Sequence, residues 1–251
     1  MSTACFRVYS ASIPGVIHRK RGQACQDKLC WKVTSHGVLL VAVADGAGSA
    51  QAAEAGATIA VETAVHALAE CLQEASAQPS HGLLADAAER ASAAVRDEAE
   101  RRQVPTSDLS STLLLVAATP SQVTSLQIGD GAIVLREASL TLLRLGAAQR
   151  GRFANETVFL GSQDAIRKAV LASFVGQWSE LAVVTDGLEV ISTTPGSQAP
   201  HGPFFHPLFD FAASRAEQAP AEQALHTFLS TPPVSDLADD DCALVLASIK
   251  R

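Results

Sequence analysis

Short apolar segments separated by turns constrain the fold of this chain more than any other feature of its sequence. They have the length and the aliphatic composition of β-strands. Several stand in pairs with only a short turn between them, which favours antiparallel hairpins over parallel strands joined by helical crossovers. The predicted strands are residues 6–11, 29–33, 38–44, 112–118, 123–128, 132–136, 140–145, 181–185 and 243–248.

Two alanine-rich segments, residues 50–76 and 81–102, predict the long helices. In both, apolar residues recur every three to four positions, which places them on one helix face, and the charged run at 96–102 faces water. Residues 209–216 and 221–229 predict shorter helices, and the Pro-, Gly- and Ser-rich residues 193–207 predict a surface loop. This order of elements favours sheets with helices packed outside them.

Composition and charge exclude several classes of protein. With 47% hydrophobic residues the chain is not mainly disordered, and its net charge of −7 argues against a nucleic-acid binder that relies on electrostatic attraction.

No apolar stretch approaches the ~18 to 20 residues of a membrane span and no signal sequence begins the chain, so a cytoplasmic protein that binds no membrane is expected. Five scattered cysteines predict reduced thiols rather than disulfides or zinc ligands. Without repeats or a long linker, a single domain over residues 1–251 is expected.

Acidic residues stand at the ends of four predicted strands. Asp45-Gly46, Asp130-Gly131 and Asp186-Gly187 follow strands, and Asp239 to Asp241 precede the last one. A single Asp-Gly after an apolar run is an ordinary turn signal. Four such clusters at rigid strand ends can converge, and converging carboxylates repel one another unless a cation neutralises them.

The chemistry of these groups narrows the choice of ion. Oxygen-only ligands select Mg or Mn over zinc or copper, and a glycine without Cβ lets its carbonyl approach an ion closely. Two ions bridged by one carboxylate can activate a shared water and clamp a phosphoryl group. The residues by themselves therefore favour a metal-dependent phosphohydrolase. No Gly-x4-Gly-Lys-[Ser/Thr] loop is present, which argues against a P-loop nucleotidase.

With two further segments the acidic motifs form an ordered set from residue 18 to 246. The set reads His18, Cys25-Gln26-Asp27, Asp45-Gly46-Ala47-Gly48, Ile128-Gly129-Asp130, Asn155-Glu156-Thr157-Val158-Phe159-Leu160, Thr185-Asp186-Gly187 and Asp240-Asp241-Cys242-Ala243-Leu244. It resembles the type 2C metal-dependent serine/threonine protein phosphatases, and within that family a compact bacterial branch. The resemblance covers nearly the whole chain.

The resemblance implies an α+β fold, a four-layer αββα sandwich of two antiparallel β-sheets flanked by helices, with two Mn or Mg ions and a third, weaker one at one end. Asp45 would bridge two ions, and the Gly46 carbonyl would bind one of them. Asp186 and Asp240 would hold the other ion, Asp27 would support the first through water, and Asp130 would help to bind the third. With Asp45 and Asp186 as catalytic residues, a metal-bridging water or hydroxide would attack phosphorus in line, without a covalent phosphoenzyme.

Some positions depart from the family pattern. Gln26 stands where Glu is common, Gly131 where Ser is common, and Ala243 where Thr or Ser is common. Gly22 stands where many members have a phosphate-binding Arg. The basic residues 18–21 lie close by, and His18 and Arg21 are the predicted phosphate-binding residues, with a solvated basic loop as the alternative. In the last motif, Asp239 and Asp241 remain alternatives to Asp240.

The predicted function is hydrolysis of phosphoserine and phosphothreonine in proteins. The implied partners are phosphorylated protein substrates, together with a cognate Ser/Thr kinase or its targets. A different Mg-dependent phosphotransfer fold is a second enzyme hypothesis, although the Asp-x-Asp pair of aspartyl-phosphate hydrolases is absent after residues 38–44. The non-enzymatic alternative is a catalytically degenerate phosphatase fold that binds or regulates a partner, and the retention of every acidic ligand argues against it.

Overall fold

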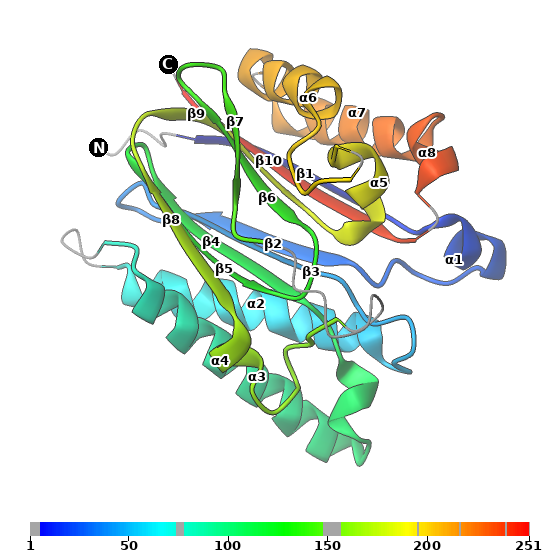
Figure 1. Ribbon diagram of the computed structural model, residues 1–251. Helices are drawn as coiled ribbons and strands as arrows, with labels where there is room; N and C mark the ends of the chain where they lie inside the picture. Colours follow the sequence, from blue (N-terminus) through cyan, green and yellow to red (C-terminus); the bar gives the residue numbers. More distant parts are fainter. Residues whose placement is uncertain are drawn as a thin grey trace.

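Two five-stranded antiparallel sheets pack face to face, and helices cover the outer face of each (Figure 1). This architecture is that of a computed structural model, which describes residues 6–73, 78–147, 157–194, 196–215, 217–238 and 240–250. The predicted four-layer αββα sandwich of the α+β class is therefore confirmed.

The strands of each sheet come from both halves of the chain. The first sheet consists, in spatial order, of β1 (Phe6–Ile13), β10 (Cys242–Ile249), β9 (Trp178–Val184), β6 (Ala132–Glu137) and β7 (Leu142–Leu145). The second consists of β2 (Lys28–Val33), β3 (Leu39–Ala44), β4 (Leu113–Thr119), β5 (Gln122–Ile128) and β8 (Val170–Val175). Because β5 and β6 belong to different sheets, the turn between them joins the two layers.

Four longer helices form the outer layers. α2 (Ala53–Cys71) and α3 (His81–Arg102) pack on the second sheet, and α6 (Gly202–Ser214) and α7 (Gln218–Ser230) pack on the first (Figure 1). The remaining turns of helix are α1 (Val16–Arg21), η1 (Thr106–Leu109), α4 (Ala165–Lys168), η2 (Asp186–Leu188), α5 (Glu189–Ser192) and α8 (Val234–Leu237). Among the described helices, none is long and apolar enough to cross a membrane.

Alternation along the strands divides the core into layers. In β3, Leu39, Val41 and Val43 face the first sheet, whereas the residues between them pack against α2. Successive side chains of a strand point to opposite faces, so one completely buried strand contributes to two core layers. The strand ends are therefore rigidly placed.

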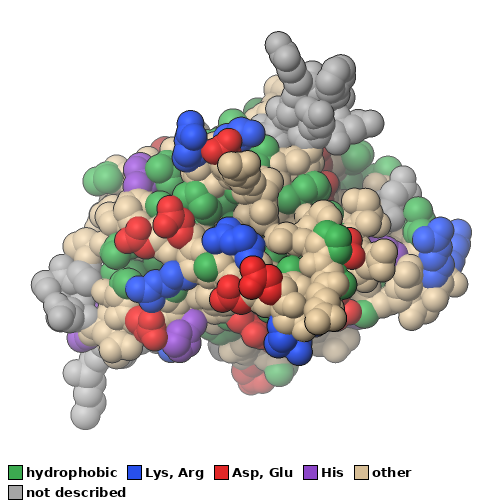
Figure 2. Space-filling model, turned by 90° about the horizontal axis from the view of Figure 1, so that it is seen from below, with side chains coloured by type: hydrophobic (Ala, Val, Ile, Leu, Met, Phe, Trp, Pro, Cys, Tyr) green, Lys and Arg blue, Asp and Glu red, His purple; other side chains and the backbone are tan. Residues whose placement is uncertain are grey.

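The outward surface of the helices is charged. Figure 2, which looks onto the molecule from below the view of Figure 1, shows acidic and basic side chains interspersed. On α3, Arg101 and Arg102 both pair with Glu98. The interpretation of residues 96–102 as a solvated helix face fits these exposed pairs.

Three segments differ from the sequence predictions. α6 begins at Gly202, inside the predicted loop, because Phe204 and Phe205 give it an apolar face and Pro203 is tolerated in a first turn. β8 is a strand that the sequence does not predict, since its short run pairs only with β5 at the sheet edge. Residues 16–21 form the short helix α1, which the sequence did not predict.

Candidate metal centre

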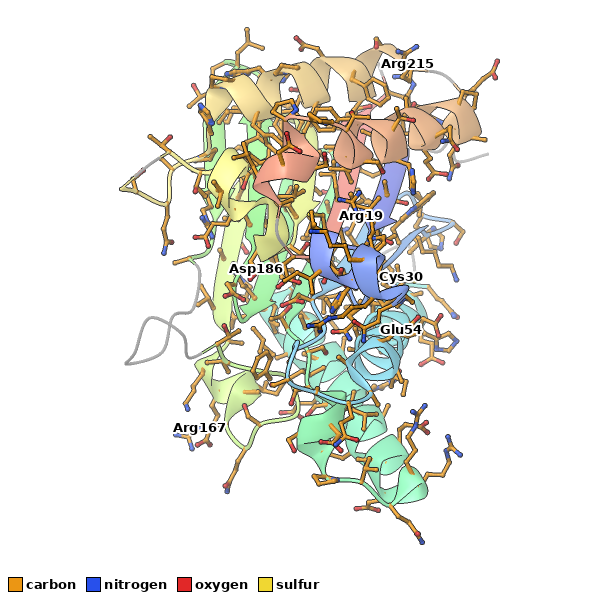
Figure 3. All side chains as sticks on the ribbon, turned by 90° about the vertical axis from the view of Figure 1, so that its right-hand side faces the viewer. Arg19, Cys30, Glu54, Arg167, Asp186 and Arg215 are labelled. Carbon is orange, nitrogen blue, oxygen red and sulfur yellow. The ribbon has the colours of Figure 1, made fainter. Side chains whose placement is uncertain are left out.

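Three aspartates meet at one end of the sandwich. Asp45 follows β3, Asp186 follows β9, and Asp130 lies in the turn between β5 and β6. One carboxylate oxygen from each lies within 4.8 Å of the oxygens from the other two. Figure 3 looks onto this end of the molecule, where Asp186 is labelled. The fold thus brings together three of the residues that the sequence predicts as metal ligands.

Two buried threonines hold the turns that carry these aspartates. The hydroxyl of Thr112 accepts a hydrogen bond from the Asp45 N–H at 2.9 Å, and the Thr112 N–H donates to the Asp45 carbonyl at 2.8 Å. In the first sheet, the hydroxyl of Thr185 accepts from the Ala243 N–H at 2.8 Å. Such supporting bonds fix the direction of a ligand. Thr112 begins the strand predicted at residues 112–118, and nothing in the sequence marked it as a partner of Asp45.

The glycines that follow the aspartates permit close packing of the backbone. A Cβ at Gly187 would overlap the carbonyl oxygen of Asp241. Gly131 has a φ of +98°, and a Cβ there would lie 2.6 Å from the Val184 carbonyl oxygen. Packing is thus a second reason for these glycines, beside the predicted approach of a carbonyl to an ion.

Asp27 lies directly before β2 and is fully buried. Neither of its carboxylate oxygens has a hydrogen-bond partner among the described residues. Burial raises the pKa of Asp27 to about 7, and the charges of Asp186 and Asp241 add to this effect, while the nearby side chains of Thr185 and Asp45 oppose part of it. A buried carboxylate without partners is costly unless a proton or a cation compensates its charge. The surroundings of Asp27 therefore fit a cation site.

The other carboxylates also favour a cation. Burial raises the pKa of Asp45 well above its ordinary value, and the charges of Asp27, Asp186 and Asp240 raise it further. Burial, followed by the charges of Asp130 and Asp240, raises the pKa of Asp186 to about 7. Carboxylates that destabilise one another's charged forms in this way gain most from a divalent ion between them.

The acidic residues of the last motif differ in their surroundings. Asp240 is exposed, and its charge raises the pKa of both Asp45 and Asp186, so it faces the cluster. Asp241 is buried, and both of its oxygens accept hydrogen bonds from protein donors. This difference favours Asp240 over Asp241 as the ligand, whereas Asp239 lies outside the described residues.

Asp130 has a partner that the sequence did not reveal. The hydroxyl of Thr157 donates a hydrogen bond to Asp130 Oδ2 at 3.1 Å. Thr157 belongs to the Asn-Glu-Thr-x-Phe-Leu segment, of which Asn155 and Glu156 lie outside the described residues. The family motif drew attention to this segment, but nothing in the sequence spacing indicates that Thr157 contacts Asp130.

The predicted phosphate-binding residues lie on α1. The Nδ1 atom of His18 is 2.8 Å from Asp241 Oδ1, and ligand atoms of His18, Asp240 and Asp241 all lie within 4.8 Å of one another. Arg21 is exposed in the last turn of α1 and forms no ion pair with any described residue. The structure thus brings His18 to the acidic end of the sandwich, and it leaves the guanidinium of Arg21 in solvent.

Two thiols near the cluster are not suited to attack a phosphoryl group. Burial, with the charge of Asp27, raises the pKa of Cys242 to about 12 and that of Cys25 further. Because the thiolate is the reactive form, these groups are inert at neutral pH. The four cysteines of the described part of the chain are free.

A separate cavity of about 500 Å³ lies between α6 and α7. Its lining is mainly apolar and includes Phe204, Phe211 and Phe228. None of the predicted site residues lines it, so the acidic centre is the better candidate for chemistry.

Known proteins share this sequence pattern. Residues 14–230 match the model of a family described as protein phosphatase 2C. The chain is also 30% identical, over 248 residues, to serine/threonine-protein phosphatase 3 of Escherichia coli (strain K12), a match that covers 96% of this chain and 98% of the relative.

Solved structures share the fold. The catalytic domain of the serine/threonine protein phosphatase PstP, in complex with two manganese ions, has a TM-score of 0.64 at 15% identity, covering 98% of this chain and 99% of that domain. The serine/threonine phosphatase Stp1 from Staphylococcus aureus has a TM-score of 0.66 at 12% identity, covering 98% of this chain and 96% of Stp1. The sequence matches, with the sandwich and its acidic end, establish that this chain belongs to the protein phosphatase 2C family.

Proposed function

We propose that the protein hydrolyses phosphoserine and phosphothreonine in proteins, using Mn or Mg and direct attack of water on phosphorus. The observation that carries this proposal is the convergence of Asp45, Asp130 and Asp186 on rigid strand ends, in a chain of this family. The manganese named with PstP supports the choice of ion class.

The donor groups fit hard divalent cations. All are oxygens, and two of them belong to the buried, unpartnered carboxylate of Asp27. The proposed ligands of two ions are Asp27, Asp45, the Gly46 carbonyl, Asp186 and Asp240, with Asp130 beside a third. When bound, the ions would lower the pKa of a water and neutralise phosphoryl charge.

The chain itself supplies orientation and substrate binding. Asp45 and Asp186, as the proposed catalytic residues, hold the reacting centre between the two sheets. His18 and Arg21 are the proposed contacts to the substrate phosphate, since a cation or an N–H donor suits phosphoryl oxygens. The proposed partners are phosphorylated proteins and the Ser/Thr kinase that modifies them, in the cytoplasm, and residues 1–251 act as one catalytic domain.

The test is hydrolysis of a phosphothreonine peptide with Mn, with Mg and with a chelator. We expect metal-dependent release of phosphate that Asp45→Ala and Asp186→Ala abolish. Asp236→Asn, which changes an exposed carboxylate of α8, is the matched control and should retain activity. A folded sample without turnover in either metal would overturn the proposal and favour the degenerate binding protein.

A further inference from the structure

Residues 15–26 lie in the connection from β1 to β2, and we call them the basic segment. They lie against the acidic end of the sandwich and have no core of their own. Its helix α1 has no buried residue, and the side chain of Ile17 is 53% exposed. No side chain caps the helix N-terminus. Figure 3 shows Arg19 of α1 at the same end of the molecule as Asp186. Burial of apolar surface therefore does little to hold this segment in place.

A single carboxylate binds the basic segment at both ends and in the middle. Asp241 Oδ1 accepts a hydrogen bond from the Gly15 N–H at 2.6 Å and lies 2.8 Å from His18 Nδ1. Asp241 Oδ2 accepts from the Gln26 N–H at 2.5 Å. The side chain of Asp241 is only 1% exposed, so these bonds lie in a low-dielectric environment where they are strong.

Asp241 is in turn fixed relative to the metal centre. Its N–H donates to Asp240 Oδ1 at 2.8 Å, and its carbonyl lies against Gly187, the residue after Asp186. A shift of Asp241 would therefore disturb the turns of two proposed metal ligands. The basic segment is attached to the same frame as the reacting centre.

The contact also determines which nitrogen of His18 can meet a substrate. A carboxylate only accepts hydrogen bonds, so the proton lies on Nδ1 of His18. The other ring nitrogen, Nε2, points away from Asp241 by the geometry of the imidazole ring. This nitrogen makes no hydrogen bond to the described residues.

We propose that Asp241 is a positioning residue for substrate binding: it holds His18 and α1 in the orientation in which they receive the phosphorylated side chain. Asp241 acts through His18 and does not bind the metal. This inference rests on the proposed phosphatase function and assigns the neighbouring acids Asp240 and Asp241 to separate tasks.

Asp241→Asn tests this role. The side-chain amide of asparagine cannot accept hydrogen bonds from Gly15, His18 and Gln26 together, because its NH₂ group is itself a donor and would face at least one of them. We expect the KM for a phosphothreonine peptide to rise about tenfold or more, while kcat and the Mn affinity from calorimetry stay within about threefold. Asp236→Asn is the matched control, because it makes the same chemical change in an exposed carboxylate shortly before β10.

A second variant removes one donor and leaves Asp241 intact. Gly15 has a φ of −63°, which proline also adopts, so Gly15→Pro removes the N–H that donates to Asp241 without requiring a new φ. We expect a smaller rise in KM in the same direction. In a His18→Ala background, Asp241→Asn should add little, because both changes remove the same positioned ring. Additive effects would overturn the role through His18.

Amide hydrogen exchange separates the failure of this inference from that of the phosphatase function. In Asp241→Asn the amides of Gly15 and Gln26 should lose protection, with or without turnover, and in Asp236→Asn they should keep it. Unchanged protection, or an unchanged KM in an active protein, contradicts the inference. A loss of Mn affinity as large as that of Asp45→Ala would make Asp241 a ligand instead. Absence of activity in the unsubstituted protein contradicts the proposed function, and the exchange still tests the attachment.

Discussion

The acidic centre and the basic segment lie side by side but are built on different principles. Asp45 and Asp186 follow strands in which every residue is buried, so their positions are set by two core layers. The basic segment has no buried residue in α1, and it depends on hydrogen bonds to Asp241. The proposed reaction groups thus stand on rigid elements, whereas the proposed recognition groups stand on a lightly attached one.

This difference predicts which kinetic constant a substitution in each region should change. Changes at the acidic centre should affect metal binding and kcat, because the proposed metal ligands and catalytic residues lie there. Changes in the basic segment should affect KM, because that segment would contact only the substrate. Four experiments break or sharpen this division, beginning with the largest effect.

Asp45→Asn and Asp186→Asn should each lower kcat by at least about a thousandfold, because each removes the charge of a proposed metal ligand. In chelator, the same variants should melt at a higher temperature than the unsubstituted protein, since each removes a carboxylate that its neighbours repel. Phosphate release and thermal melting measure the two effects. Substantial activity in either variant would contradict the assignment.

The metal-free protein should lose stability as pH rises. Asp27 and Asp186 have pKa values of about 7 in the folded protein and an ordinary value of 3.8. Between these values the folded state binds more protons than the unfolded state, so the free energy of unfolding falls from about pH 4 to pH 7 and then levels off. Each kcal/mol lost lowers Tm by about 2 to 4 °C.

Melting curves in chelator at pH 5 and pH 8 measure this dependence. Mn should diminish it, because the ion binds the ionised carboxylates and stabilises the folded state. A Tm that rises with pH in chelator would show that the carboxylates are not destabilising one another.

Thr112→Val should weaken the acidic centre without touching a ligand. The Asp45 N–H loses its acceptor inside the protein, which costs about 1 to 3 kcal/mol of stability. We expect kcat to fall about tenfold, as is typical when a ligand's supporting bond is removed. Thr112→Ser keeps the hydroxyl and is the control, and equal kcat values in the two variants would count against the role of this bond.

Arg21→Ala should have the smallest effect. Its exposed guanidinium is screened by solvent and salt, so we expect only about a two- to threefold rise in KM, which shrinks as salt is added. Arg167→Ala removes another exposed arginine, which pairs with Asp164 near α4, and should leave KM unchanged. A change in kcat with constant KM would place Arg21 with the reacting groups.

Much of the fold was predictable because many of its strands are apolar and buried along all or nearly all of their length, as β3, β4 and β9 are. β8 was not, because a strand with one exposed face and one neighbour carries a weak pattern. The start of α6 was obscured by Pro203 and Pro207, although the phenylalanines between them decide the helix by packing.

The acidic cluster was visible in the sequence because each aspartate stands at the end of an apolar run. The supporting contacts were not, since Thr112 meets Asp45 across 67 positions and His18 meets Asp241 across 223. Two adjacent aspartates also look alike in one dimension. In the fold, burial and the hydrogen bonds to both of its oxygens distinguish the enclosed Asp241 from the exposed Asp240.

The turn between β5 and β6 joins the two sheets at the end where the aspartates meet. Asp45 belongs to the second sheet and Asp186 to the first, so an ion shared by both would be a mechanical staple between the layers. If the two sheets were pulled apart by force, they would then separate first at the end of the sandwich opposite the aspartates. Catalysis and resistance to shear would depend on the same few oxygen atoms.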